Sequence, residues 1–289
     1  MDQASEKADL PPAWSKAITA ACAGRRIVVL GATDMGKSTF IRAFLAKSGQ
    51  AAMLIDLDPG QKMIGPPGTV ALGRLEPAMV ERFIFIGSTS SSSISKIARA
   101  AADLARIADR SGPFIANTSG FVTGLGARLQ AATVAALKPD LIVEIGSVPD
   151  APPLVPIQFP DIRLLRLERS PAARRKSPAA RARLRQQALD DALRGARMLT
   201  LPSLQFDPAP PAALAGAARP ICALADGTGV DRSYGILEAV EEGCVRIQAV
   251  APERPIERIR LGRMWAEPKA GGWRLMEKLS PSWVSPVGA

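Results

Sequence analysis

The sequence predicts an α/β protein built on a mostly parallel sheet with helices on both faces, followed by a small β domain at its C-terminal end. Two observations support this fold class. Between residues 26 and 195, short apolar runs typical of buried strands alternate with segments whose apolar residues recur at helical spacing. After a stretch rich in proline and alanine at 206–220, only short strand-like segments separated by turns remain.

Each expected element follows from its local pattern. Strands are predicted where apolar residues gather over a few positions, at 28–30, 51–61, 69–75, 82–90, 113–121, 140–146 and 162–168. Helices are predicted where apolar residues lie three and four apart, at 13–24, 39–47, 95–110, 127–139 and 179–193. The C-terminal domain is expected to contain strands within 221–227, 233–250 and 256–268.

The same patterns divide the chain into four parts. We expect a polar tail and a short helix at 1–24 and a main domain at 25–205. A linker at 206–220 then leads to the small β domain at 221–289.

Composition limits the possible chemistry. The sequence has no histidine, which excludes Ser-His-Asp and Cys-His catalysis as well as histidine metal sites. Three scattered cysteines match neither a zinc motif nor a disulfide framework. No uncharged apolar run is long enough to span a bilayer, and the N-terminus lacks the basic-then-apolar layout of a signal peptide. We therefore expect a reduced, cytoplasmic protein without membrane contact.

Positive charge is concentrated in one segment. Lys and Arg number 37 against 27 Asp and Glu, a formal net charge of +10. Residues 161–197 hold eleven basic and four acidic residues, so this segment alone carries +7 of that charge. Most charge runs are solvated helix faces, but this degree of clustering favours contact with a phosphate-rich partner.

The most specific motif is the stretch GATDMGKST, which has the spacing Gly-x-x-x-x-Gly-Lys-Ser of a phosphate-binding loop. An apolar run precedes it and a helical pattern follows it, which is the strand–loop–helix context that the motif requires. Lys37 is expected to reach the β- and γ-phosphates of ATP, and the Ser38 hydroxyl to bind Mg²⁺. The expected nucleotide-binding residues are Gly31, Ala32, Thr33, Asp34, Met35, Gly36, Lys37, Ser38 and Thr39.

Two acids follow the second expected strand, in the stretch LIDLDPGQ. Asp56 and Asp58 lie two residues apart, so on a strand both side chains point to one face. One carboxylate could hold Mg²⁺ and the other could accept a proton from an attacking hydroxyl. An aspartate that caps the turn before Pro59 would give the same pattern.

Several motifs in this order resemble one family. GATDMGKST, LIDLDPGQ, PPGTVALG, FIGSTS, NTSGF and the arginine-rich segment are similar to motifs of the polynucleotide 5′-hydroxyl kinases. These include the kinase subunit of the pre-mRNA cleavage machinery and the kinase of ribosomal RNA processing. The resemblance implies a compact member that lacks the N-terminal β domain of the eukaryotic relatives. The implied partner is a nucleic acid with a 5′-hydroxyl end, with RNA preferred over DNA; the resemblance identifies no protein partner.

The resemblance also assigns catalytic roles. It implies that Asp58 activates the 5′-hydroxyl and that Asp56 joins Ser38 at the Mg²⁺ ion. It further implies a lid at about 169–195 whose arginines neutralise charge on the transferring phosphoryl group. We expect Arg169 and Arg174 in this catalytic role. Their competitors, expected to contact the substrate, are Arg175 and Arg181.

The stretch Thr118-Ser119-Gly120-Phe121 is similar to the family's Thr-x-Gly-Trp clasp, which grips the polynucleotide end. Phenylalanine keeps a stacking surface but has less area than tryptophan and lacks its indole N–H donor. Thr118, Gly120 and Phe121 are therefore expected to bind substrate, together with Gln61. Residues 87–89 match a family loop that we expect near the phosphates or the polynucleotide, although serine-rich composition at 88–95 would also fit a flexible linker.

Three functions remain open at this point. The leading one is ATP-dependent phosphorylation of the 5′-hydroxyl end of RNA or DNA. The first alternative is an ATP-binding, non-catalytic module of a nucleic-acid processing complex, which would bind nucleic acid with negligible ATP turnover. The second is a P-loop kinase of a small molecule, whose activity would be insensitive to salt because it makes few phosphate contacts.

Overall fold

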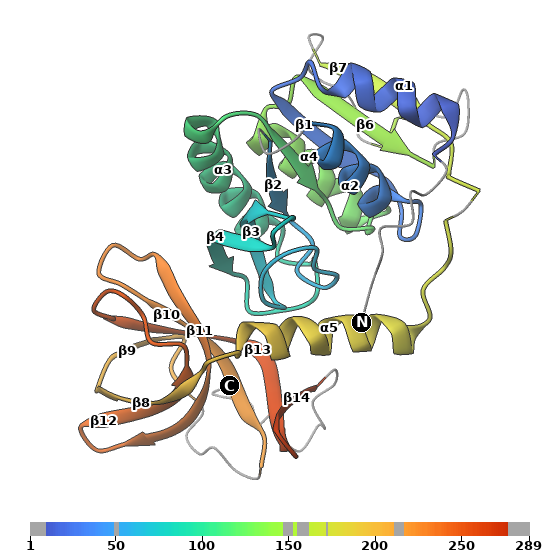
Figure 1. Cartoon of the computed structure of the whole chain (residues 1–289). Coiled ribbons are helices and arrows are strands. Elements are labelled where there is room, and N and C mark those ends of the chain that lie inside the picture. The colour runs from blue at the N-terminus through green and yellow to red at the C-terminus, as the bar shows by residue number, and fades with distance from the viewer. Residues whose placement is uncertain are drawn as a thin grey trace.

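The computed structural model describes residues 10–48, 52–146, 153–154, 162–171, 173–210 and 217–276. These residues form two sheets of seven strands each, and the long helix α5 (Pro178–Ala192) connects them (Figure 1). We refer to them as the first and the second sheet. Among the described residues, no helix is both long and apolar enough to cross a membrane.

The first sheet has the order β4-β3-β2-β5-β1-β6-β7. Five neighbouring strands run parallel to one another, namely β2, β5, β1, β6 and β7. Strand β3 pairs antiparallel with β2, and β4 pairs antiparallel with β3. This arrangement confirms the predicted α/β fold class. The strands are β1 (Arg26–Leu30), β2 (Met53–Asp56), β3 (Thr69–Arg74), β4 (Met79–Phe85), β5 (Phe114–Asn117), β6 (Leu141–Ile145) and β7 (Arg163–Leu167).

Helices cover both faces of this sheet because its central strands are apolar on both sides. Val28 and Leu30 of β1 pack toward α3 (Ile94–Ser111) and α4 (Leu125–Leu137). Ile27 and Val29, which alternate with them along the strand, pack toward α1 (Pro12–Ala21) and α2 (Lys37–Ser48). The sheet is therefore packed between two apolar layers. Polar side chains can be placed at the strand ends, which these layers do not cover.

The second sheet has the order β14-β13-β10-β11-β12-β8, with β9 paired to β13. It begins at β8, which follows helix α5 (Pro178–Ala192) directly. The β region therefore starts before the expected boundary at 221, and part of the expected linker, residues 211–216, lies outside the described residues. The strands are β8 (Arg197–Pro202), β9 (Gln205–Asp207), β10 (Arg219–Ala225), β11 (Asp231–Glu241), β12 (Cys244–Ala249), β13 (Arg258–Lys269) and β14 (Gly272–Met276).

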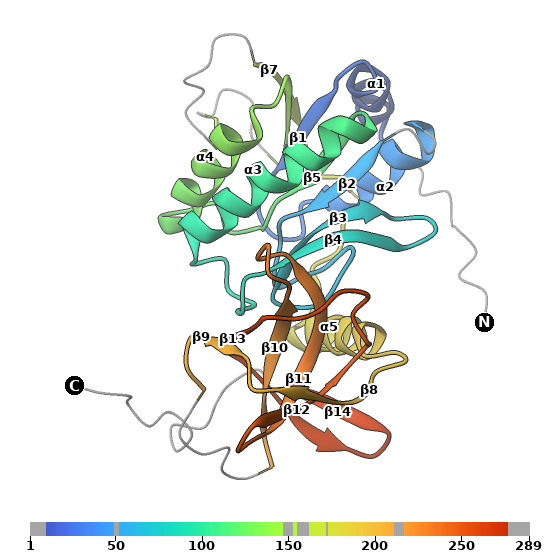
Figure 2. The same ribbon diagram turned by 90° about the vertical axis from the view of Figure 1, so that its left-hand side faces the viewer.

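The two sheets lie next to each other (Figure 2), and buried side chains from both form one apolar cluster. The backbone N–H of Phe85 donates to Asp231 at 2.8 Å, and the buried Tyr234 hydroxyl donates to the carbonyl oxygen of Pro67 at 3.1 Å. Gly87 has φ +80°, and a Cβ there would lie 2.8 Å from the Cα of Gly262. Glycine is thus required where the two parts of the chain approach most closely.

Candidate active site

The phosphate-binding loop lies between the end of β1 and the start of α2, as the motif predicts. Gly31 and Gly36 have φ angles of 151° and 108°, which favour glycine. A Cβ on Gly36 would lie 2.7 Å from the Trp14 ring, so a larger residue would not fit there. The loop is therefore shaped by backbone geometry, and its N–H groups can face a bound anion.

Lys37 is buried in this loop. Its Nζ donates to the carbonyl oxygens of Gly31 at 2.7 Å and Ala32 at 3.0 Å. Burial lowers the pKa of Lys37 to about 8, while the nearby Asp58 and Asp34 carboxylates oppose this shift. A phosphate group near Nζ would favour the charged ammonium in the same way, so the lysine is suited to a phosphate ligand.

The structure separates the roles of the two aspartates. Asp56 is fully buried, and its Oδ2 accepts from the backbone N–H of Met63 at 2.7 Å and pairs with Lys62 Nζ at 3.0 Å. Its Oδ1 accepts from Asn117 Nδ2 at 2.9 Å. Both oxygens are therefore already used, and the expectation that Asp56 binds Mg²⁺ does not fit this geometry. Asp56 instead organises the loop that follows β2.

Asp58 is the acid that lines the cavity beside the phosphate-binding loop. Strand β2 ends at Asp56, two residues before Asp58. Asp58 Oδ1 accepts from the backbone N–H groups of Gly60 at 2.9 Å and Gln61 at 3.0 Å, as a turn-capping aspartate does. Burial, and secondarily the Asp56 charge, raise the pKa of Asp58. A carboxylate with a raised pKa is a better proton acceptor.

The cavity that brings these groups together has a volume of about 230 Å³ and lies at the carboxyl ends of β1, β2 and β5. In parallel α/β sheets, ligands bind at this edge. Asn117 and Lys176 also line it, and the sequence analysis missed both. The lining residues are Thr33, Asp34, Gly36, Lys37, Ser38, Thr39, Asp58, Gln61, Asn117, Gly120, Ala173, Arg174, Lys176 and Arg181.

The arginine-rich segment closes one side of the cavity. Arg181 of α5 donates to Asp34 Oδ2 at 2.5 Å, and the backbone N–H of Lys176 donates to the same oxygen at 3.0 Å. Arg174 lines the cavity, whereas Arg169 is exposed and donates to the carbonyl oxygen of Ala173 at 2.5 Å. Of the four predicted arginines, the structure therefore places Arg174 and Arg181 at the site.

Arg175 does not line the cavity and is exposed. The expected catalytic position of Arg169 is likewise not seen, because its guanidinium stabilises the turn that presents Arg174. Sequence reasoning could not rank these arginines, because the backbone between β7 and α5 has no regular periodicity that fixes side-chain direction.

The predicted clasp is only partly accessible. Thr118 is buried, and its hydroxyl donates to the carbonyl oxygen of Val29 at 2.8 Å, so it joins β5 to β1. A Cβ on Gly120 would lie 2.6 Å from the Cα of Thr33, which explains why this position is glycine. Phe121 is 43% exposed beside the cavity wall that Gly120 provides. Its ring is the part of the clasp that remains available to a ligand.

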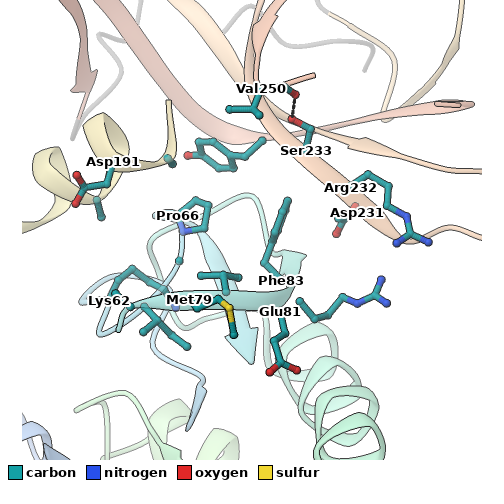
Figure 3. Close-up of a pocket in the computed structure, with 18 of the residues that line it drawn as sticks. Lys62, Pro66, Met79, Glu81, Phe83, Asp191, Asp231, Arg232, Ser233 and Val250 are labelled. Atoms are coloured by element: carbon teal, nitrogen blue, oxygen red, sulfur yellow. Dashed lines mark hydrogen bonds between the residues drawn. The ribbon is translucent and has the colours of Figure 1, made fainter. Parts of the chain in front are cut away.

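A second, larger cavity of about 800 Å³ lies between the β3–β4 hairpin, α5 and the second sheet (Figure 3). Lys62 and Pro66 line one side, and Asp191, Ser233 and Val250 line the other. No residue of the phosphate-binding loop at 31–39, all of which the structure describes, contributes to it. The smaller cavity is therefore the candidate active site.

Curated proteins with similar sequences carry kinase names. The chain is 30% identical over 178 residues to a polyribonucleotide 5′-hydroxyl-kinase of Pyrococcus furiosus, covering 56% of this chain and 49% of that protein. It is 33% identical over 142 residues to a polyribonucleotide 5′-hydroxyl-kinase of Thermococcus kodakarensis, covering 42% of this chain and 38% of that one. A protein CLP1 homolog of Dictyostelium discoideum is 31% identical over 143 residues, covering 42% of this chain and 31% of its own length.

The chain thus spans about a third to a half of the length of these relatives. Among solved structures, a complex of Clp1p with Pcf11p matches with a TM-score of 0.67 at 12% identity, covering 86% of this chain and 79% of that one. This likeness supports the fold. The family model described as "mRNA cleavage and polyadenylation factor CLP1 P-loop" matches residues 31–191, more than half of the chain. The match includes the phosphate-binding loop, Asp58, Phe121 and most of the arginine-rich segment, and the chain belongs to this CLP1 P-loop family.

Proposed function

We propose that the protein is an ATP-dependent kinase of polynucleotide 5′-hydroxyl ends, with RNA preferred over DNA. The observation that carries this proposal is the meeting of Lys37, Asp58 and Arg174 in one cavity at the carboxyl edge of the first sheet. The cavity therefore offers phosphate-binding groups, a proton acceptor and an additional positive charge. Phosphoryl transfer requires these groups and no covalent enzyme intermediate.

The loop residues fit a nucleotide triphosphate and a hard divalent cation. Ser38 at the start of α2 places a hydroxyl oxygen on the cavity wall, and oxygen is the ligand that Mg²⁺ prefers. When bound, Mg²⁺ would offset negative charge on the phosphate oxygens. Lys37 and the loop N–H groups would bind the phosphates, and Arg174 would add charge where the γ-phosphoryl group leaves.

Asp58 has the properties of the proton acceptor. As the 5′-hydroxyl oxygen forms its bond to the γ-phosphorus, the bond from that phosphorus to the β–γ bridging oxygen breaks and ADP leaves. The hydroxyl proton passes to the Asp58 carboxylate. Because burial raises the pKa of this group, the transfer rate should fall as pH drops through that raised value.

The test is transfer of labelled γ-phosphate from ATP to 5′-hydroxyl oligonucleotides of RNA and DNA, measured side by side. Wild-type protein should label RNA more efficiently than DNA. Lys37→Ala removes a phosphate-binding charge and Asp58→Asn removes the proton acceptor, so both should reduce labelling by at least about 100-fold. Arg175→Ala is the matched arginine control, since that residue does not line the cavity. Nucleotide binding that Lys37→Ala weakens, without any transfer to either oligonucleotide, would contradict the proposal and indicate a non-catalytic module.

A further inference from the structure

Strand β5 ends inside the candidate active site. It lies between β1 and β2, and its last residue, Asn117, is in register with Val29 on one side and Asp56 on the other. Enzymes with a phosphate-binding loop commonly hold Mg²⁺ with the loop Ser or Thr and a carboxylate at a strand end. Here the corresponding strand end carries an amide, and the two acids come from the neighbouring strand and its loop.

The orientation of the Asn117 amide is fixed by its partner. The side chain is 97% buried, and Nδ2 donates to the Asp56 carboxylate at 2.9 Å. A carboxylate that also pairs with Lys62 accepts hydrogen bonds, so the amide nitrogen must face it and the amide oxygen must face away. This arrangement resolves the choice between the two orientations of the amide group.

The Oδ1 atom of Asn117 has no hydrogen-bond donor among the described residues. Buried polar atoms in native proteins are nearly always hydrogen-bonded, and an exception needs an explanation. Asn117 lines the cavity that also contains Ser38 and Asp58. A ligand bound in this cavity is therefore a candidate for the missing donor.

We propose that Asn117 is a metal-positioning residue, whose Oδ1 accepts a hydrogen bond from a water molecule of the hydrated Mg²⁺ ion held with the nucleotide by Ser38. This inference deepens the proposed function and rests on its MgATP site. Through Nδ2, the same side chain fixes Asp56, and the Asp56 carboxylate in turn accepts from the backbone N–H of Asp58 at 3.3 Å. One amide thus links the metal's water shell to the acid that lines the cavity.

Lys37 is the competing donor. Its Nζ already donates to two loop carbonyls and has one further proton, and it lines the same cavity. If Asn117 served Lys37, its removal would weaken nucleotide binding equally with and without Mg²⁺. If Asn117 serves a metal-bound water, its removal should matter only when Mg²⁺ is present.

The experiment is calorimetric titration of a non-hydrolysable ATP analogue into the whole protein, once in Mg²⁺ and once in EDTA. For Asn117→Ala, we expect the affinity in EDTA to stay within twofold of wild type and the Mg²⁺-dependent gain in affinity to fall about tenfold, the usual effect of losing an outer-shell partner of a metal. Gln130→Ala is the matched control, because Gln130 is also a buried amide with an unsatisfied oxygen but does not line the cavity. It should keep the full Mg²⁺ effect.

Equal losses in Mg²⁺ and in EDTA, or no loss in either, would overturn the inference. Thermal unfolding of each variant reports whether it folds. If Asn117→Ala does not fold, Asn117→Ser replaces it, because serine lacks the amide oxygen and adds no charge beside Asp56. A full Mg²⁺ effect in that variant would refute the metal role. No polynucleotide is present in this assay, so a failure of the kinase proposal would leave its outcome unchanged.

Discussion

The pair formed by Asp34 and Arg181 should couple the phosphate-binding loop to helix α5. Asp34 lies in the loop with φ +63°, and its Oδ2 accepts from Arg181 at 2.5 Å and from the backbone N–H of Lys176 at 3.0 Å. The side chains of Asp34 and Arg181 are 9% and 24% exposed. The contact is therefore partly shielded from solvent, and it directly links the loop to the arginine-rich segment.

The expected size of this coupling follows from its burial. Exposed ion pairs contribute about 0.2–1 kcal/mol, whereas hydrogen bonds to charged groups in shielded positions contribute about 1.5–3 kcal/mol. With limited exposure on both sides, we expect a coupling free energy of about 1.5 kcal/mol between Asp34 and Arg181. Asp34→Asn is the suitable change, because the amide oxygen can still accept from Lys176 and the Arg181 charge that remains is partly exposed to solvent.

The assay is a double-mutant cycle on the free energy of unfolding in urea, with Asp34→Asn, Arg181→Gln and the double variant. Asp191 and Arg194 at the end of α5 provide a matched cycle, because their ion pair is 52% and 80% exposed and should couple by about 0.5 kcal/mol or less. A coupling between Asp34 and Arg181 no larger than in this control cycle would refute the argument that the pair holds the lid against the loop.

Three further predictions follow from single groups. Because burial lowers the pKa of Lys37 to about 8, nucleotide affinity measured by calorimetry should decline as pH rises from 7 to 9 and the ammonium loses its proton; Lys37→Ala should bind weakly with no such decline. Phe121→Ala should weaken oligonucleotide binding by about 1–3 kcal/mol in fluorescence anisotropy, whereas Phe121→Trp should strengthen it, and equal affinities for all three proteins would exclude a stacking role. Tyr234→Phe removes the buried hydrogen bond to Pro67 and should lower the free energy of unfolding in urea by about 1–2 kcal/mol; no loss would show that this contact does not stabilise the junction.

The main features of the fold could be predicted because they depend on local pattern. The short apolar runs in the sequence correspond to strands of the first sheet, and the longer periodic segments correspond to its helices. The start of the second sheet was not predictable in this way. Strand β8 (Arg197–Pro202) lies at a sheet edge with alternating exposure, so its sequence shows little apolar clustering. Its place is set by pairing with β12, which is distant in sequence.

The site was predictable where a motif fixes its own geometry. The spacing of the phosphate-binding loop places Lys37 and Ser38 without reference to the rest of the chain. The roles of Asp56 and Asn117 could not be found from spacing, because they depend on β5 lying between β1 and β2. That strand order brings together two residues 61 positions apart and uses the Asp56 oxygens for hydrogen bonds within the protein.

Asp34 illustrates why the phosphate-binding loop and the arginine-rich segment must be considered as one electrostatic unit. A carboxylate inside a phosphate-binding loop repels the phosphates that the loop is shaped to hold. Arg181, 147 residues away in sequence, neutralises that charge by direct contact, and Arg174 of the same arginine-rich segment lines the cavity. Loss of the contact between Asp34 and Arg181 would leave the Asp34 charge uncompensated beside the phosphates, so it should lower the affinity of the loop for phosphate.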